Sequence, residues 1–184
     1  RLVAAAKRVG AVVVADNTFA TPLNQSPLAL GVDVVIHSAT KFLSGHGDVL
    51  GGLVCGREAL MAQVRHYREI NGASLDPFSA YLIIRGMKTL ALRMRQQQHS
   101  ARALAEFLCT EPLVEAVNYP GLPSHPNHAV ACAQMSGFGA IVSFVLVGGM
   151  DTVKLLLPRL RFAHCAGNLG AVETIYGPAR TSSN

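Results

Sequence analysis

Two apolar runs, separated by a short helical piece, constrain the fold of this 184-residue chain more than any other feature. They read A-V-V-V-A at 11–15 and V-D-V-V-I at 32–36, and such β-branched runs are typical of strands buried on both faces. Residues 2–9 have a helical pattern that ends at Gly10, and residues 27–30 form the short helical piece. This alternation of helix and strand predicts an α/β layer with a largely parallel sheet.

Residues 49–70 continue this α/β layer, whereas the residues from 76 onward have a different, at first mostly helical, pattern. A third strand with glycine kinks is expected at 49–56, and a helix at 57–70. Residues 76–110 are helical almost throughout, with Gly86 as the weak point. After the stretch L-V-E-A-V-N-Y at 113–119, a strand is expected at 139–147 and helices at 129–135 and 151–160. The change of character predicts a boundary near 105–112, before a smaller α+β part.

Composition excludes several classes of protein. Hydrophobic residues make up 50% of the chain and charged residues 15%, so a large core can be buried and intrinsic disorder is excluded. No apolar run is long enough for a transmembrane helix, and no signal-peptide pattern is present. An aromatic content of 6%, without Trp, argues against a base-stacking nucleic-acid module. The chain opens on Arg1 inside a helical pattern, which indicates a fragment of a longer protein.

The basic residues and the cysteines have structural interpretations. The net charge is +5, and part of the excess falls in the long helical stretch, on Arg85, Lys88, Arg93, Arg95 and Arg102. We interpret these five as a solvated or inter-subunit helix face, because no nucleic-acid motif accompanies them. The cysteines lack C-x-x-C or zinc spacing, and their apolar neighbours indicate small buried side chains in a reducing compartment. They are Cys55, Cys109, Cys132 and Cys165.

The stretch after the first strand carries residue types that one cofactor uses together. Asp16 ends that strand, and Lys41 lies in the loop after the second strand, flanked by Ser38 and Thr40. Pyridoxal phosphate (PLP) needs an amine for a Schiff base, an anion at its ring nitrogen, and hydroxyl and N–H donors for its phosphate. Because ligands of α/β sheets bind beyond the carboxyl ends of the strands, we expect these side chains to meet there.

Taken one at a time, the polar residues of these loops have ordinary structural explanations, so only the ordered combination carries the hypothesis. His46 and Asp48 are interpreted as turn residues that position the lysine loop, and His37 as a core histidine. His125 and His128 have no third ligand nearby, so no metal site is expected.

Four motifs occur in order along the chain: A-D-N-T-F-A-T-P, S-A-T-K-F-L-S-G-H-G-D-V-L-G-G, Y-L-I-I-R-G-M-K-T-L and N-L-G-A-V-E-T. In this order they resemble motifs of the Cys/Met-metabolism PLP-dependent enzymes. The resemblance covers essentially the whole chain and implies an α/β fold of the aspartate-aminotransferase-like type (fold type I). Residues 1–108 would be the second half of the PLP-binding large domain with its mostly parallel sheet. Residues 109–184 would be part of the smaller C-terminal α+β domain.

The same resemblance implies pyridoxal 5'-phosphate as the cofactor and gives each site residue a role. Lys41 would be the catalytic Schiff-base lysine, and Asp16 would pair with the pyridinium nitrogen. Ser38 and Thr40 would hold the phosphate, and Asn168 would bind the carboxylate of a small amino-acid substrate. The implied protein is a cytoplasmic homotetramer, a dimer of dimers, with neither nucleic-acid nor membrane partners.

Trans-sulfuration is the activity implied by the resemblance: γ-replacement or γ-elimination on homoserine-ester or cystathionine-type substrates, as in cystathionine γ-synthases and γ-lyases. The reaction type stays open, because Asn168 after Gly167 is more similar to sulfhydrylases whereas G-A-V-E-T is more similar to the cystathionine group. O-acetylhomoserine sulfhydrylase and methionine γ-lyase are therefore alternatives. An inactive truncated paralogue is a hypothesis of another class, since the family's chains are longer and the ending T-S-S-N departs from its pattern.

Overall fold

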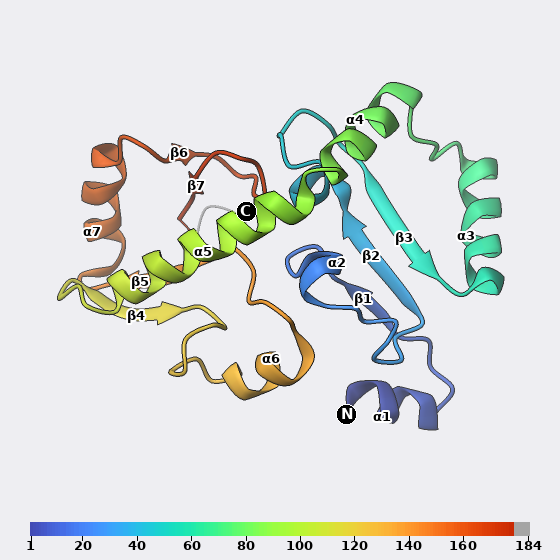
Figure 1. Ribbon diagram of the computed structural model, residues 1–184, viewed down its shortest axis with the longest axis horizontal. Coiled ribbons are helices and arrows are strands. Elements are labelled where there is room, and N and C mark those ends of the chain that lie inside the picture. Colours follow the sequence, from blue (N-terminus) through green and yellow to red (C-terminus); the bar gives the residue numbers. More distant parts are fainter. Residues whose placement is uncertain (179–184) are drawn as a thin grey trace.

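Helix α5 (Leu90–Leu108) runs between two groups of elements in the structure, a computed structural model that describes residues 1–178 (Figure 1). The motif T-S-S-N lies outside the described residues. The first group consists of α1 (Leu2–Arg8), β1 (Val14–Asp16), α2 (Thr21–Asn24), β2 (Val34–Ser38), the helical turn η1 (Ala39–Leu43), β3 (Gly52–Gly56), α3 (Glu58–Asn71) and α4 (Pro77–Met87). The expected helices at 2–9 and 57–70 are thus present, and the strands are shorter or shifted by a few residues.

The second group follows α5 and contains small sheets and short helices. Its elements are β4 (Val114–Asn118), α6 (His128–Gln134), β5 (Ser143–Leu146), α7 (Gly149–Leu156), the 3-10 turn η2 (Leu157–Arg159), β6 (His164–Cys165) and β7 (Ile175–Tyr176). β4 pairs with β5 in antiparallel orientation, and β6 pairs with β7 in parallel orientation. Three of these seven elements, β5, α6 and α7, match the expected strand and pair of helices.

The sheet of the first group is mixed, with strand order β1-β2-β3, so the expectation of a largely parallel sheet is wrong for the described strands. β1 is parallel to β2, but β3 is antiparallel to β2, with Val35 opposite Cys55. The backbone N–H groups of Ala39 and Thr40 both donate to the carbonyl of Gly51, at 2.8 and 3.3 Å. This pairing brings the end of the β2–β3 connection back beside its start, so the chain returns as a hairpin and not through a crossover.

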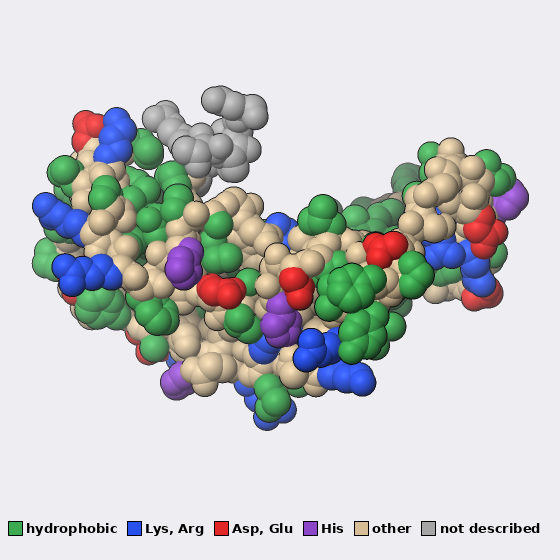
Figure 2. All heavy atoms as spheres, turned by 90° about the horizontal axis from the view of Figure 1, so that it is seen from above, with side chains coloured by type: hydrophobic (Ala, Val, Ile, Leu, Met, Phe, Trp, Pro, Cys, Tyr) green, Lys and Arg blue, Asp and Glu red, His purple; other side chains and the backbone are tan. Residues whose placement is uncertain are grey.

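Burial of the first strand and of the cysteines differs from the sequence-based expectation. Val14 of β1 is 55% exposed, and β1 is an outer strand that pairs only with β2 among the described strands. All four cysteines are exposed and none forms a disulfide, so their interpretation as buried side chains is also wrong. Cys55 lies on the outer strand β3, Cys109 follows the end of α5, Cys132 lies within α6 and Cys165 lies on β6. Figure 2 shows that hydrophobic side chains are spread over the face seen there.

Helix α5 joins two buried clusters. Its first turns pack Leu90 and Met94 against Phe42 and Leu43 of the helical turn η1. Its later turns pack Ala101 and Ala105 against Tyr119, whose hydroxyl donates to the carbonyl of Gly139 at 3.0 Å. The interpretation of the five basic residues as a solvated face holds for four of them. It is wrong for Arg93, which is half-buried and hydrogen-bonded to backbone carbonyls. No helix of the described part is long and apolar enough to cross a membrane.

Gly86 is the position where α4 touches the lysine-bearing turn. The break between α4 and α5 falls at Lys88 and Thr89, two residues after this expected weak point. A Cβ atom at Gly86 would lie 2.1 Å from the backbone oxygen of Ser44, so no larger residue fits without moving η1 away. Glycine at this position is therefore required by the close approach of two backbones.

Gly86→Ala is expected to destabilise the protein by about 1–3 kcal/mol, since overpacking outweighs the gain of up to about 1 kcal/mol in helix propensity. Chemical denaturation of the two proteins measures this difference. Gly167→Ala is the matched control, because nothing lies within 4 Å of a Cβ built there. Equal stability of Gly86→Ala and the parent would show that the approach of α4 to η1 is not tight.

Candidate active site

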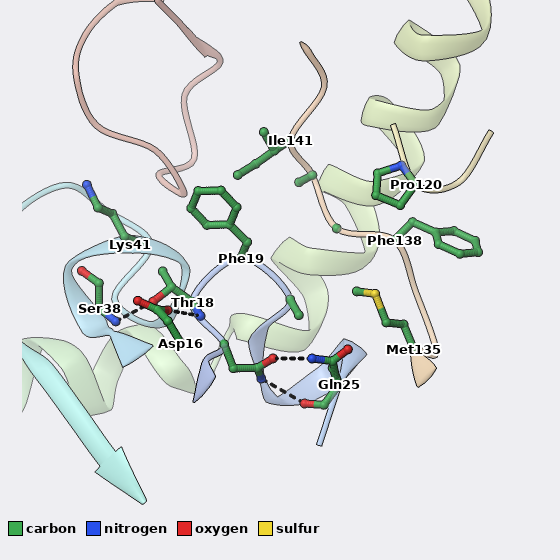
Figure 3. A pocket seen from close by; sticks show the side chains of 14 residues that line it. Asp16, Thr18, Phe19, Gln25, Ser38, Lys41, Pro120, Met135, Phe138 and Ile141 are labelled. Carbon is green, nitrogen blue, oxygen red and sulfur yellow. Dashed lines mark hydrogen bonds between the residues drawn. The ribbon is translucent and has the colours of Figure 1, made fainter. Parts of the chain in front are cut away.

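One cavity, with a volume of roughly 730 Å³, lies at the carboxyl ends of β1 and β2 (Figure 3). Asp16, Ser38 and Lys41 line it from the sheet side. Phe138 and Ile141, from the segment between α6 and β5, line the opposite wall. The structure therefore brings three of the five predicted site residues to one apolar-walled cavity, at the sheet edge where ligands of α/β proteins bind.

Asp16 is held as a carboxylate at the end of β1. Hydrogen bonds from the side chain and the backbone N–H of Thr18 are the main causes that lower the pKa of Asp16 below its usual value, with the N–H 2.9 Å from Oδ1. The neighbouring His37 is buried, with an Nδ1 that has no partner in the described residues, and its burial lowers its pKa. The expectation of a core histidine is thus confirmed for burial but not for hydrogen bonding. Because the hydrogen bonds from Thr18 lower its pKa, Asp16 stays ionised near neutral pH.

Thr18 connects the ends of the two parallel strands, and sequence reasoning missed it. Its Oγ1 accepts the backbone N–H of Ser38 at 2.8 Å, as Figure 3 shows. Thr18 itself is buried. The available signal was its position two residues after an aspartate, where an Asx-turn places a backbone N–H on the carboxylate. Thr18 thereby fixes Asp16 and Ser38 relative to each other.

Removal of the Thr18 hydroxyl is expected to change how stability depends on pH. Because the folded-state pKa of Asp16 is lowered, its contribution to stability is present above the unfolded-state pKa and is lost as pH falls through the folded-state pKa. Thr18→Val should raise the pKa of Asp16, so its stability deficit should be larger near neutral pH than in acid.

NMR titration of the Asp16 carboxyl carbon and denaturation at several pH values measure both effects. Thr18→Ser keeps the hydroxyl and is the control. An unchanged Asp16 titration in Thr18→Val would contradict the role given to this hydroxyl.

Lys41 lies inside the irregular turn η1, at an interruption of its helical geometry (φ −91°, ψ −125°). The N–H of Ser44 bonds back five residues to Ala39, at 3.0 Å, whereas the N–H of Gly45 bonds back four residues to Lys41, at 2.9 Å. Lys41 is half-buried, while the other three lysines, Lys7, Lys88 and Lys154, are exposed. This turn presents the Lys41 side chain to the cavity.

Asn168 reaches the lysine from the second group of elements. It does not line the cavity, but its Oδ1 accepts a hydrogen bond from Nζ of Lys41 at 2.5 Å. The contact joins residues 127 positions apart in the chain. A side-chain amide next to the reactive amine is suited to bind a carboxylate, because its NH₂ group is a donor.

Thr40 is the one predicted cofactor residue that faces elsewhere. Its hydroxyl accepts the N–H of Gly51 at 3.0 Å and lies 3.4 Å from the Gly51 carbonyl, and it is absent from the cavity lining. The hydroxyl already bonds to the β2–β3 connection, so the structure does not bring it to Ser38 and Lys41. Its assignment to a phosphate stays a prediction.

The histidines set aside by the sequence analysis form local hydrogen bonds. His46 places Nδ1 2.7 Å from the carbonyl of Ser44, as expected for a residue that orders the lysine loop. His128 places Nδ1 2.7 Å from the carbonyl of Pro120, and its Nε2 lies 3.4 Å from Sγ of Cys132. Across residues 1–178, no group of three or more His, Cys, Asp or Glu side chains is arranged to hold a metal ion.

The chemistry of these side chains fits pyridoxal phosphate. The cofactor requires an amine, an anion and a hydroxyl donor around one cavity, and Lys41, Asp16 and Ser38 supply these groups here. The lowered pKa of Asp16 suits a residue that must stay charged opposite a pyridinium nitrogen. Phe19 also lines the cavity and offers an aromatic surface.

Comparison with known proteins defines the class. The family model described as Cys/Met metabolism PLP-dependent enzyme matches residues 1–183, and the chain belongs to this family. The cofactor of the family is pyridoxal phosphate. The resemblance and the fold type expected from the sequence are both confirmed.

Individual relatives carry several activities. The chain is 49% identical over 166 residues to cystathionine gamma-synthase 1, chloroplastic, of Arabidopsis thaliana, covering 90% of this chain and 30% of that protein. It is 50% identical over 165 residues to L-methionine gamma-lyase of Fusobacterium nucleatum, covering 89% and 42%. A cystathionine gamma synthase structure from Xanthomonas oryzae, in complex with aminoacrylate and cysteine, superposes with a TM-score of 0.94 at 43% identity, covering 96% and 46%. The chain thus spans less than half the length of these proteins.

Proposed function

We propose that the complete protein containing this chain is a PLP-dependent trans-sulfuration enzyme. It carries out γ-replacement or γ-elimination on homoserine-ester or cystathionine-type amino acids. The observation that supports this most is the meeting of Lys41, Asp16 and Ser38 at one cavity, with Asn168 bonded to the lysine amine. Relatives at 49% and 50% identity, named as a cystathionine gamma-synthase and an L-methionine gamma-lyase, agree with this reaction class.

Bound pyridoxal phosphate supplies an electron sink that makes the Cα proton of an attached amino acid acidic. The carboxylate of Asp16 would accept the N–H of the cofactor's ring nitrogen and so keep it protonated, for which the ionised state of Asp16 is required. The hydroxyl of Ser38, which lines the cavity, would donate to the phosphate. Thr40 is assigned the same task, for which its hydroxyl would exchange its bond to Gly51 for one to the phosphate.

Proton transfer belongs to Lys41. With cofactor and substrate bound, the free amine of Lys41 would remove the proton from Cα of the substrate and would donate a proton further along the substrate side chain. Asn168 binds the substrate carboxylate through its amide, next to this amine. The substrate is thereby held with its Cα within reach of the base, which is a requirement of general base catalysis.

The domain division and the assembly are also proposals. Residues 1–108 belong to the PLP-binding large domain and residues 109–184 to the smaller C-terminal domain, with α5 closing the first. Exposed side chains on α3 and α4, such as Tyr67 (68%) and Phe78 (69%), support subunit contacts in a homotetramer. We place the protein in the cytoplasm, and its substrate is a small amino acid.

Product analysis tests the proposed activity and separates its variants. The complete protein is incubated with cystathionine, with O-succinyl- or O-acetyl-homoserine plus cysteine or sulfide, and with methionine. Cystathionine formation or cleavage supports the main proposal, whereas homocysteine from sulfide or a thiol from methionine supports O-acetylhomoserine sulfhydrylase or methionine γ-lyase. No turnover of any of these, by a protein that retains the cofactor, would favour the inactive paralogue.

A further inference from the structure

We propose that Arg93 and Gln97, one helical turn apart on α5, are positioning residues that fix the amine of Lys41 against Asn168. Arg93 holds the segment that carries the lysine, and Gln97 holds the segment that carries the asparagine. The inference deepens the proposed function and rests on it. We call residues 39–45 the lysine turn.

The guanidinium of Arg93 holds the lysine turn through backbone carbonyls. Nη1 donates to the oxygen of Phe42 at 2.8 Å, and Nη2 lies 3.3 Å from the oxygen of Leu43. These are the two residues directly after Lys41. Nη2 also donates to the oxygen of Gly86 at 2.9 Å, and Nε donates to Oγ1 of Thr89 at 3.1 Å. Arg93 therefore joins the lysine turn to the C-terminal end of α4.

This arrangement leaves little freedom around the guanidinium. A Cβ atom at Gly45 would lie 2.0 Å from Nη1 of Arg93, so the lysine turn ends on a glycine that lies directly against the charge. Burial lowers the pKa of Arg93, and within residues 1–178 no carboxylate pairs with it. Carbonyl oxygens compensate the lost hydration through charge-assisted bonds, which are roughly twice as strong as neutral ones.

Gln97 holds the segment that carries Asn168, the hydrogen-bond partner of Lys41. Its Nε2 donates to the backbone oxygen of Ala171 at 2.8 Å, three residues after Asn168. Between them Gly170 (φ +85°) approaches the lysine turn, and a Cβ built there would lie 2.6 Å from the backbone nitrogen of Phe42. The segment with Asn168 thus packs backbone to backbone on the lysine turn, while Gln97 holds its far end.

Positions four apart on a helix face the same side, so one rigid face of α5 holds two segments that are distant in the sequence. The relative position of the Lys41 amine and Asn168 is therefore set by Arg93 and Gln97. A misplacement of about 1 Å can cost about 10²-fold in rate, so such residues affect chemistry without touching the substrate. Their effects are separable, because Arg93 acts on the lysine and Gln97 on the substrate-binding residue.

The test uses the complete protein freed of its cofactor. Pyridoxal phosphate is added, samples are reduced with borohydride at intervals, and the labelled Lys41 peptide is quantified by mass spectrometry. Arg93→Met is expected to slow attachment about tenfold, while the matched variant Arg95→Met, an exposed arginine of the same helix, keeps the parental rate. Arg93→Lys, which retains the charge and part of the bonding, should lie between them.

Gln97→Ala is expected to leave the attachment rate within about twofold and to raise KM about fivefold, for cystathionine or for O-succinyl-homoserine with cysteine, whichever the parent turns over. Gln96→Ala, whose amide bonds only to the exposed Ser100 hydroxyl, is its control. General loosening of α5 would change both quantities together in both variants, so this split separates positioning from a merely structural role.

Parental attachment rates in both Arg93 variants, or a parental KM in Gln97→Ala, would overturn the inference. If Arg93→Met does not fold, Arg93→Lys and Gln97→Ala decide by the same criteria. If the parent itself fails to attach the cofactor at Lys41, the proposed function fails as well, whereas a labelled parent with unaffected variants overturns the positioning roles alone.

Discussion

Lys41→Ala is expected to lower turnover by a factor on the order of 10³ or more, because the side chain that both attaches the cofactor and moves the substrate proton is removed. The assay is steady-state product formation by the complete protein on the substrate identified by product analysis. The structure supports this effect because the other three lysines are exposed and none of them lines the cavity.

Lys88→Ala is the matched control, since Lys88 is exposed at the C-terminal end of α4. It should keep the parental rate within about twofold, as surface substitutions usually do. Turnover by Lys41→Ala above one tenth of the parental rate would mean that another group supplies the amine, and the assignment of the site would then be wrong.

Asp16→Asn is expected to lower kcat by a factor on the order of 10², because a neutral amide cannot keep the cofactor ring nitrogen protonated. The substitution preserves the size of the side chain, and the Thr18 N–H can still bond to the amide oxygen. Asp151→Asn removes an exposed carboxylate whose 3.4 Å ion pair with Lys154 lies on the surface, and it serves as the control.

Measuring cofactor attachment in Asp16→Asn shows whether a lower kcat comes from slower chemistry or from weaker cofactor binding. Borohydride labelling at Lys41 should still occur in this variant, since the lysine and its turn are untouched. Parental kcat with full cofactor loading would show that the ring nitrogen does not depend on this carboxylate.

Residues close together in the sequence were the predictable part of the site. The pattern from Asp16 to Lys41 lies on two neighbouring parallel strands and the turn after the second, so strand order alone brings the carboxylate, Ser38 and the amine to one edge. The candidate role of Asn168 depended on family resemblance, since no local pattern relates it to a lysine 127 positions away.

Contacts between distant segments account for what could not be predicted. The V-L-G-G-L-V-C-G run predicts a strand but does not tell whether this strand runs parallel or antiparallel to the preceding one. The hydrogen bonds from Ala39 and Thr40 to Gly51 close a hairpin, so β3 runs antiparallel to β2. Thr40 has the residue type of a phosphate ligand, but the same connection engages its hydroxyl. Arg93 resembles its exposed neighbours in sequence, and only the packing of the lysine turn on α5 explains its burial.

Exposed cysteines and valines were mispredicted for a related reason. An apolar or β-branched residue indicates what could be buried, but the neighbouring layer determines what is buried. Val14 and Cys55 lie on β1 and β3, the two outer strands of the three-stranded sheet, and both side chains are exposed.

Borohydride reduction of the complete protein with bound pyridoxal phosphate, followed by peptide mass spectrometry, tests the central claim most directly. Within this chain the candidate lysines are Lys7, Lys41, Lys88 and Lys154. We predict a single modified peptide that carries the reduced cofactor on Lys41. A label on any other lysine of the complete protein, or no label after full reconstitution, would contradict the assignment of this cavity as a pyridoxal phosphate site.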